Sequence, residues 1–85
     1  MFIKELYLNV DYFREQIDGI KSWNEKVVKD ITSFGNELVK GIEYYRRMAD
    51  AILKKGKERF IEELDLCEDK VKTMLMDCQV TEGRL

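Results

Sequence analysis

Acidic side chains crowd one stretch of the chain and raise the first question of chemistry. Glu62, Asp65 and Asp69 are spaced three and four residues apart, so on a helix they share one face and could hold a divalent cation. Metal sites in helical bundles, however, draw ligands from several facing helices, often as Glu-x-x-His pairs, and this chain has no histidine. Because the acids flank Leu64 and Cys67, the inward positions of that helix, we favour a solvated charged face.

No other combination of residues matches a catalytic or cofactor-binding motif. The chain has no Gly-rich phosphate loop, no nucleophile elbow and no closely spaced cysteine pair. Cys67 and Cys78 are too few for a disulfide framework and predict free cytosolic thiols. We therefore expect a protein that is not an enzyme and has no cofactor, metal or small-molecule substrate. The net charge of −2 argues against a nucleic-acid partner, since small domains that bind phosphate backbones are usually strongly basic.

Basic residues gather in the middle of the chain. Residues 38–60 contain seven basic and three acidic side chains, whereas residues 61–85 contain three basic and seven acidic ones. Two blocks of opposite charge can neutralise each other within a chain or between copies. The basic block fits either the ordinary solvated flank of a coiled coil, which we favour, or a contact with an anionic surface. The candidate contacts of the second kind are Arg46, Arg47, Lys54, Lys55, Lys57 and Arg59.

Hydrophobic residues recur in alternating steps of four and three along most of the chain. This heptad spacing is typical of a coiled-coil-like helix pair or bundle. We expect the seam to hold copies of the chain together as a homo-oligomer. Its residues are Phe13, Ile17, Ile20, Val27, Ile31, Phe34, Leu38, Tyr45, Met48 and Ile52, with Leu6, Val10 and Gly41 in the same frame.

Further apolar residues lie outside this seam. Because one small hairpin cannot cover both sides of the helix, we expect a second copy to cover Val28, Ile42, Ala49 and Leu53. A second run with the same spacing, from Phe60 to Cys78, belongs to a different frame.

Gly56 marks the clearest break between helices. It follows Lys54 and Lys55, and cations in a last turn with a glycine just beyond them indicate a helix end, where glycine adopts the left-handed conformation cheaply. We expect the chain to turn here and return as an antiparallel helix.

A second candidate break lies near Gly19. Ser22 followed by Glu25 reads as a capping box for a new helix, whereas the heptad stays in phase through this region, as an unbroken helix requires. Asn24 is either a polar seam residue that fixes register or a residue of a new first turn. We favour a kink or short break.

The prediction is an all-α fold: an antiparallel helical hairpin with a short N-terminal helix, forming a three-helix, coiled-coil-like bundle. The expected helices cover about residues 3–18, 22–55 and 58–79 of a single domain, 1–80, followed by a frayed tail, 81–85.

Part of this pattern resembles the membrane-sculpting modules of the BAR and F-BAR superfamily. The similarity covers roughly Val10 to Phe60 and concerns only the first part of such modules, which are longer. It rests on Asp18-Gly19 and on Ile42, Glu43, Tyr45, Arg46, Ala49 and Leu53. The resemblance implies binding of curved anionic membranes by antiparallel dimers, through the basic residues named above as candidate contacts.

The apolar N-terminal segment does not predict targeting. Glu5 and Asp11 interrupt it, no small-residue cleavage site follows, and no stretch approaches the roughly 18 apolar residues of a membrane span. We expect a cytoplasmic protein, with peripheral membrane contact as a variant.

The function expected from these features is that of a non-enzymatic, oligomerising helical scaffold or adaptor that mediates protein–protein interaction, with a BAR-like role at an anionic membrane as its sharper form. The alternative is a small regulatory or inhibitory protein that docks an apolar helix face on a larger partner.

Overall fold

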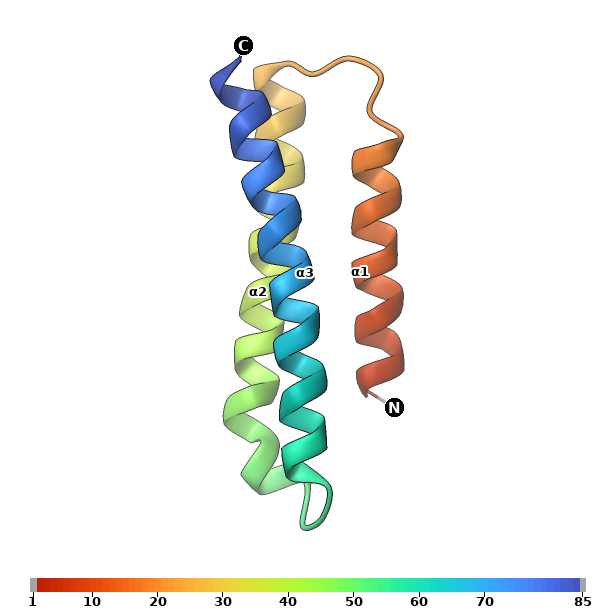
Figure 1. Cartoon of the computed structure of the whole chain (residues 1–85), viewed down its shortest axis with the longest axis vertical. Coiled ribbons are helices and arrows are strands. Elements are labelled where there is room, and N and C mark those ends of the chain that lie inside the picture. Colours follow the sequence, from red (N-terminus) through yellow and green to blue (C-terminus); the bar gives the residue numbers. More distant parts are fainter. Residues whose placement is uncertain (1, 85) are drawn as a thin grey trace.

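Three helices, drawn in Figure 1, form an up-down-up bundle in the computed structural model. They are α1 (Phe2–Asp18), α2 (Glu25–Ile52) and α3 (Lys57–Gly83). The structure describes residues 2–84, and all of their side chains except those of Phe2, Ile3 and Ile52. α2 and α3 form an antiparallel hairpin, and the shorter α1 lies beside it, parallel to α3. The predicted all-α three-helix bundle is therefore confirmed.

The helix breaks between α1 and α2, as expected, but the residue that caps the start of α2 is Asn24 and not Ser22. Gly19 N donates the last helical hydrogen bond of α1 to Glu15 O, at 2.9 Å. Asn24, in an extended conformation, begins α2: its Oδ1 accepts from Val27 N at 3.0 Å. The Ser22 capping box was thus wrong, because α2 begins only at Glu25 and the Asn24 side chain directly before it satisfies the free amide of Val27 in the first turn. Asn24 is a helix cap and not a seam residue.

The connection between α2 and α3 also differs in detail. α2 ends at Ile52 rather than at residue 55, because Leu53 is already extended. Gly56 has the predicted left-handed conformation, with φ of 76°, but it stands at the N-cap of α3. A residue with a β-carbon would be strained there. α3 then continues to Gly83, so residues 81–83 are helical and not a tail.

The core takes apolar side chains from all three helices, and no polar or charged side chain is buried among the described residues. Its members are Leu6, Val10, Phe13, Val28, Ile31, Ile42, Ala49, Leu64, Cys67, Val71, Leu75 and Cys78. α2 therefore turns residues 28, 35, 42 and 49 inward, one position along from residues 27, 34, 41 and 48 of the predicted seam.

Gly35 is the reason for this rotation of α2. A β-carbon on Gly35 would lie 2.5 Å from Leu75 Cδ2 and 2.8 Å from Phe13 Cζ, so α2 meets the other two helices at the one inward position without a side chain. The residues that were expected to need a second copy, including Val28 and Ile42, are thereby 2% and 0% exposed within a single chain. That argument for self-association was wrong.

Opposite charges join the two long helices, as the charge asymmetry suggested. Arg46 of α2 donates from Nη1 to Glu68 Oε2 at 3.2 Å and from Nη2 to Asp65 Oδ1 at 2.6 Å. The side chains of Arg46 and Asp65 are 32% and 56% exposed, so solvent screens part of this attraction. Near the turn, the Lys57 ammonium contacts the Asp50 carboxylate.

Candidate partner-binding surface

Aromatic rings lead from the core to the surface where α1 and α2 meet. Phe34 stacks on the buried Phe13, with ring centroids 5.6 Å apart, and its ring also lies 5.7 Å from that of Tyr12. Phe34 is 37% exposed and Tyr12 44% exposed, although both rings are large and mostly apolar. The bundle therefore leaves part of an aromatic cluster uncovered.

This cluster forms one wall of a hollow of about 300 Å³. Apolar side chains make most of the lining, and its polar side-chain groups are the Tyr12 hydroxyl, the Gln16 amide and the Asp30 carboxylate. We call this site the α1–α2 groove and define it by its lining residues: Tyr12, Gln16, Ile20, Val27, Asp30, Ile31 and Phe34.

The local sequence explains why the groove stays open. Because Gly35 is the inward residue, the preceding residue, Phe34, stands at the α1 edge of α2 instead of in the centre of the core. α1 ends at Asp18, so this end of the groove is lined by Val27 and by Ile20 of the connecting segment rather than by a further turn of α1.

Charged residues of both signs flank the groove: Asp30 lines it, and the exposed Lys21 and Lys26 stand directly beside its lining residues Ile20 and Val27. Asp30 and Glu37 stand four residues before and three residues after Phe34 on α2, and Glu15 follows Tyr12 by three residues on α1; all three acids are exposed. Glu37 is 3.5 Å from Lys40, an exposed pair that contributes little. No basic side chain lines the groove among the described residues. The exposed Leu8 extends the apolar surface along α1.

The predicted seam residues divide between the core and this groove. Phe13 and Ile31 are buried, and Ile17, Ile20, Leu38 and Tyr45 are half-buried against the core. Met48 is half-buried, Val27 and Phe34 lie in the groove, and the side chain of Ile52 falls outside the described ones. The sequence did not predict that the groove is lined by Tyr12, Gln16 and Asp30. The one feature that could have pointed to Tyr12 was its position directly beside the seam residue Phe13.

The six candidate contacts for an anionic surface do not form one free cluster. Arg46 and Lys57 are engaged as described above, and Arg59 lies 3.8 Å from Glu63. The remaining three, Arg47, Lys54 and Lys55, are exposed, and the described part of the chain provides no ion pair for them.

The acidic face of α3 and the thiols offer no evident reactive centre. Asp65 is bonded to Arg46, and residues 2–84 contain no group of three or more His, Cys, Asp or Glu side chains placed to hold a metal. Cys67 and Cys78 are free and buried, and burial raises the pKa of both thiols. Because the thiolate is the reactive form, both cysteines are poor nucleophiles at neutral pH.

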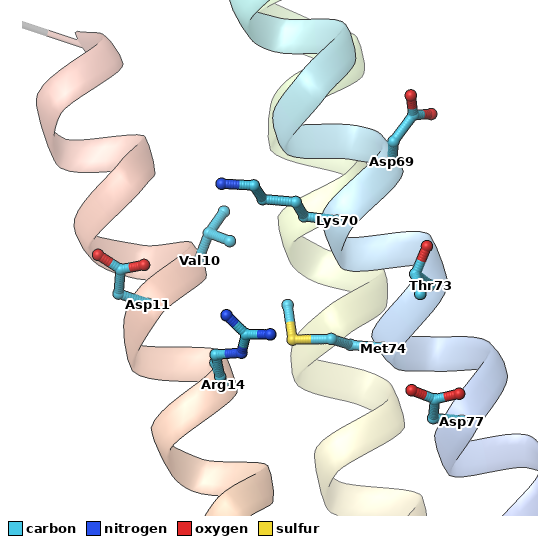
Figure 2. A pocket seen from close by; sticks show the side chains of 8 residues that line it. All are labelled: Val10, Asp11, Arg14, Asp69, Lys70, Thr73, Met74 and Asp77. Atoms are coloured by element: carbon cyan, nitrogen blue, oxygen red, sulfur yellow. The ribbon is translucent and has the colours of Figure 1, made fainter.

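A second hollow, of about 310 Å³, lies between α1 and α3. In Figure 2, Arg14 of α1 and Met74 of α3 point toward one another, and Lys70 reaches from α3 toward α1. The lining also includes the acids Asp11, Asp69 and Asp77, so charges of both signs meet there. Toward the start of α1, burial raises the pKa of Tyr7, and Glu63 adds to the shift. The mixed charge favours no particular ligand.

None of the helices, as far as the structure describes them, is both long and apolar enough to cross a membrane. The chain has no match among family models, and neither the curated proteins nor the solved structures give a significant match.

Proposed function

We propose that this protein is a non-catalytic helical adaptor that binds another protein chain through the α1–α2 groove. The observation that carries the proposal is the half-exposed pair Tyr12 and Phe34, in which Phe34 stacks on the buried ring of Phe13 and Tyr12 lies against Phe34. Tyrosine and phenylalanine are enriched at protein interfaces, and anchors held rigid before binding lose little conformational freedom when a partner docks.

The shape of the site supports a helical partner. Two antiparallel helices with an apolar hollow between them offer a seat for a third helix, as in known complexes where an amphipathic helix fills a groove. α1 is about 25 Å long, so a docked helix could follow it for four to five turns. The whole protein would then act as a small adaptor or as a regulator of a larger partner.

Site-specific photo-cross-linking tests the proposal. A photoreactive residue at position 16, which lines the groove, should give a discrete adduct in cells that express the protein. The matched control is position 80 on α3, where Val80 is also exposed. Equal adduct yields from the two positions, or none from position 16, would contradict the proposal. An adduct of twice 10.1 kDa would identify a second copy as the bound chain.

A second candidate function is contact with an anionic membrane surface. It is supported by the resemblance to BAR modules and by the exposed Arg47, Lys54 and Lys55, for which the described residues provide no ion pair. Each basic residue near such a surface contributes about 1 kcal/mol. The protein should then sediment with phosphatidylserine vesicles and not with neutral ones, and Arg47→Glu with Lys54→Glu should abolish sedimentation. Failure of the wild-type protein to sediment with anionic vesicles would exclude this function.

A further inference from the structure

We infer that two copies of this chain can exchange their α1 helices. In the exchanged dimer, residues 2–52 of each copy form one continuous helix, and the α1 part of that helix packs on the α2–α3 hairpin of the other copy. The partner is thus a second copy, and it binds the face of the hairpin that α1 covers in the closed bundle, which is the three-helix form of a single chain (Figure 1). The inference concerns the core and does not rest on the proposed function.

The first observation is that the buried faces of α1 and α2 share one direction on an ideal α-helix. Val10 and Val28 are eighteen residues apart, as are Phe13 and Ile31, and all four are buried. At about 3.6 residues per turn, eighteen residues make about five complete turns, so both pairs would project from the same side of a continuous helix. In the closed bundle α1 and α2 are separate, antiparallel helices, and nothing in their packing requires this agreement.

Exchange requires such an agreement. The two continuous helices would lie antiparallel, related by a two-fold axis perpendicular to the plane of the pair. Because that axis places both α3 helices on the same side of the pair, the α1 part and the α2 part of one helix must turn their apolar faces in the same direction. The buried residues of α1 and α2 meet this requirement. The core contacts are then those of the closed bundle with α1 supplied by the other copy, which makes exchange a low-cost route to a dimer.

The second observation concerns the connection between α1 and α2, residues 19–24. Gly19 N and Ile20 N still donate to carbonyl groups of α1, at 2.9 and 3.1 Å, so the helical turn continues into the connection. The structure describes the whole of this segment, which contains no proline and no residue with positive φ, whereas the turn at Gly56 depends on a φ of 76°. The connection can therefore become helical without leaving an obligatory turn conformation.

The third observation is the position of Asn24. Phe13 stacks on Phe34, and the point midway between them in the chain falls between residues 23 and 24, so the two-fold axis of the exchanged dimer would pass beside Asn24. In a continuous helix Asn24 would also lie on the inward stripe, eighteen residues from the buried Leu6 and from the buried Ile42. An asparagine on the seam of two helices fixes their register, and the axis would bring the two copies of Asn24 together.

Light scattering of the purified full-length chain, refolded from urea at up to about 1 mM, tests for a dimer of twice 10.1 kDa. Gly19→Ala should lower the Kd of the dimer by about thirtyfold, because the helix preference of alanine over glycine acts in both copies. In the closed bundle, moreover, the new β-carbon would lie only 3.2 Å from Glu15 O.

Gly41→Ala is the matched control. Gly41 is helical in both forms and a β-carbon there would meet nothing within 4 Å, so the Kd should not change. Lys21→Gly with Ser22→Gly should suppress the dimer, since glycine at these exposed positions disfavours a helix across the connection. Circular dichroism checks that each variant keeps its helical fold.

Spin-label distances distinguish exchange from any other dimer. The labels replace the exposed Lys4 and Glu43 of the Gly19→Ala chain, in the background Cys67→Ala with Cys78→Ala. In the closed bundle the two positions lie at the same level of adjacent helices, whereas in one continuous helix they are thirty-nine residues, or about 58 Å, apart. The labelled chain is refolded with an excess of unlabelled chain, so that the distance is measured within one copy. The dimer should give the long distance and the monomer the short one.

Three results would overturn the inference. They are a chain that stays monomeric at about 1 mM both as wild type and as Gly19→Ala, an equal change of the Kd by Gly19→Ala and Gly41→Ala, and a dimer whose labels stay at the short distance. None of them decides the adaptor function, which the cross-link at position 16 tests separately. If that position gives an adduct of twice 10.1 kDa, the long distance supports exchange, and the short distance means that the second copy binds in another way.

Discussion

Leu75 of α3 fills the space that a side chain at Gly35 of α2 would occupy: a β-carbon on Gly35 would lie 2.5 Å from Leu75 Cδ2 and 3.0 Å from Leu75 Cγ. This close approach fixes the rotation of α2. It also places Phe34, the neighbour of Gly35, at the α1 edge of the helix, where its ring lines the groove. One missing side chain thereby connects the packing of the core to the candidate binding surface.

Replacing Gly35 with alanine should destabilise the protein by about 1 kcal/mol. Alanine improves helix propensity by about 1 kcal/mol, but overpacking a tight contact costs about 1–3 kcal/mol. Urea unfolding of Gly35→Ala, with and without Leu75→Val, measures the coupling between the two positions. The smaller valine should relieve the clash, so the same cost of Gly35→Ala in both backgrounds would contradict the packing described above.

Removing the cap of α2 should also lower stability. Asn24→Ala leaves the amide of Val27 without its side-chain acceptor, and loss of such a cap costs about 1 kcal/mol. Ser22→Ala is the matched control and should stay within about 0.5 kcal/mol of the wild type, since an exposed substitution away from such features has a small effect. Thermal melts of the two variants decide between these caps, and an equal loss for both would restore the Ser22 capping box.

The buried thiols predict a loss of stability in alkaline solution. Burial raises the pKa of Cys67 and Cys78 above the ordinary value of 9.0, so above that pH the unfolded chain releases thiol protons that the folded chain retains. The unfolded state then binds fewer protons, and the free energy of unfolding falls as the pH rises through the folded-state pKa values. The stabilisation that comes from the protonated thiols of Cys67 and Cys78 is fully present below pH 9.0.

Chemical denaturation between pH 8 and pH 10 checks this prediction. The half-buried Tyr7, whose pKa is raised from 10.0, acts in the same direction at the upper limit. The control is Cys67→Ala with Cys78→Ala, whose stability should depend less steeply on pH. A wild-type protein whose stability is constant across this range would contradict the prediction. The native thiols should also react slowly with a thiol reagent and rapidly after unfolding.

The bridge from Arg46 to Asp65 and Glu68 should contribute measurably to stability. Arg46→Gln removes two charge-assisted hydrogen bonds, and we expect a loss of about 1 kcal/mol, because the pair with Asp65 is partly screened by solvent. Arg47→Gln changes the adjacent, exposed residue, for which the described residues show no ion pair, and should have almost no effect. Melting temperatures at low and high salt compare the two variants. An equal effect of both would show that the bridge adds nothing.

Local patterns in the sequence were sufficient for the fold class. The 3-4 spacing of apolar residues predicts helices because it follows from the helical repeat and needs no knowledge of the partner surface. Gly56 and the lysines before it located the turn of the hairpin, and the left-handed conformation of Gly56 was correctly predicted. The opposite charges of the two long helices indicated their pairing, which the bonds of Arg46 display.

The tertiary structure alone decided which edge of α2 faces inward. In the sequence, Phe34 and Met48 give the stronger apolar stripe, whereas the true inward stripe contains Gly35 and Ala49, whose small size hides their position. Small residues contribute little hydrophobicity but permit close helix contact, and that benefit exists only when Leu75 is present on the facing helix. The sequence by itself therefore determined three amphipathic helices, whereas the packing of all three decided that Phe34 and Tyr12 would remain half-exposed, at the surface where we propose that another chain binds.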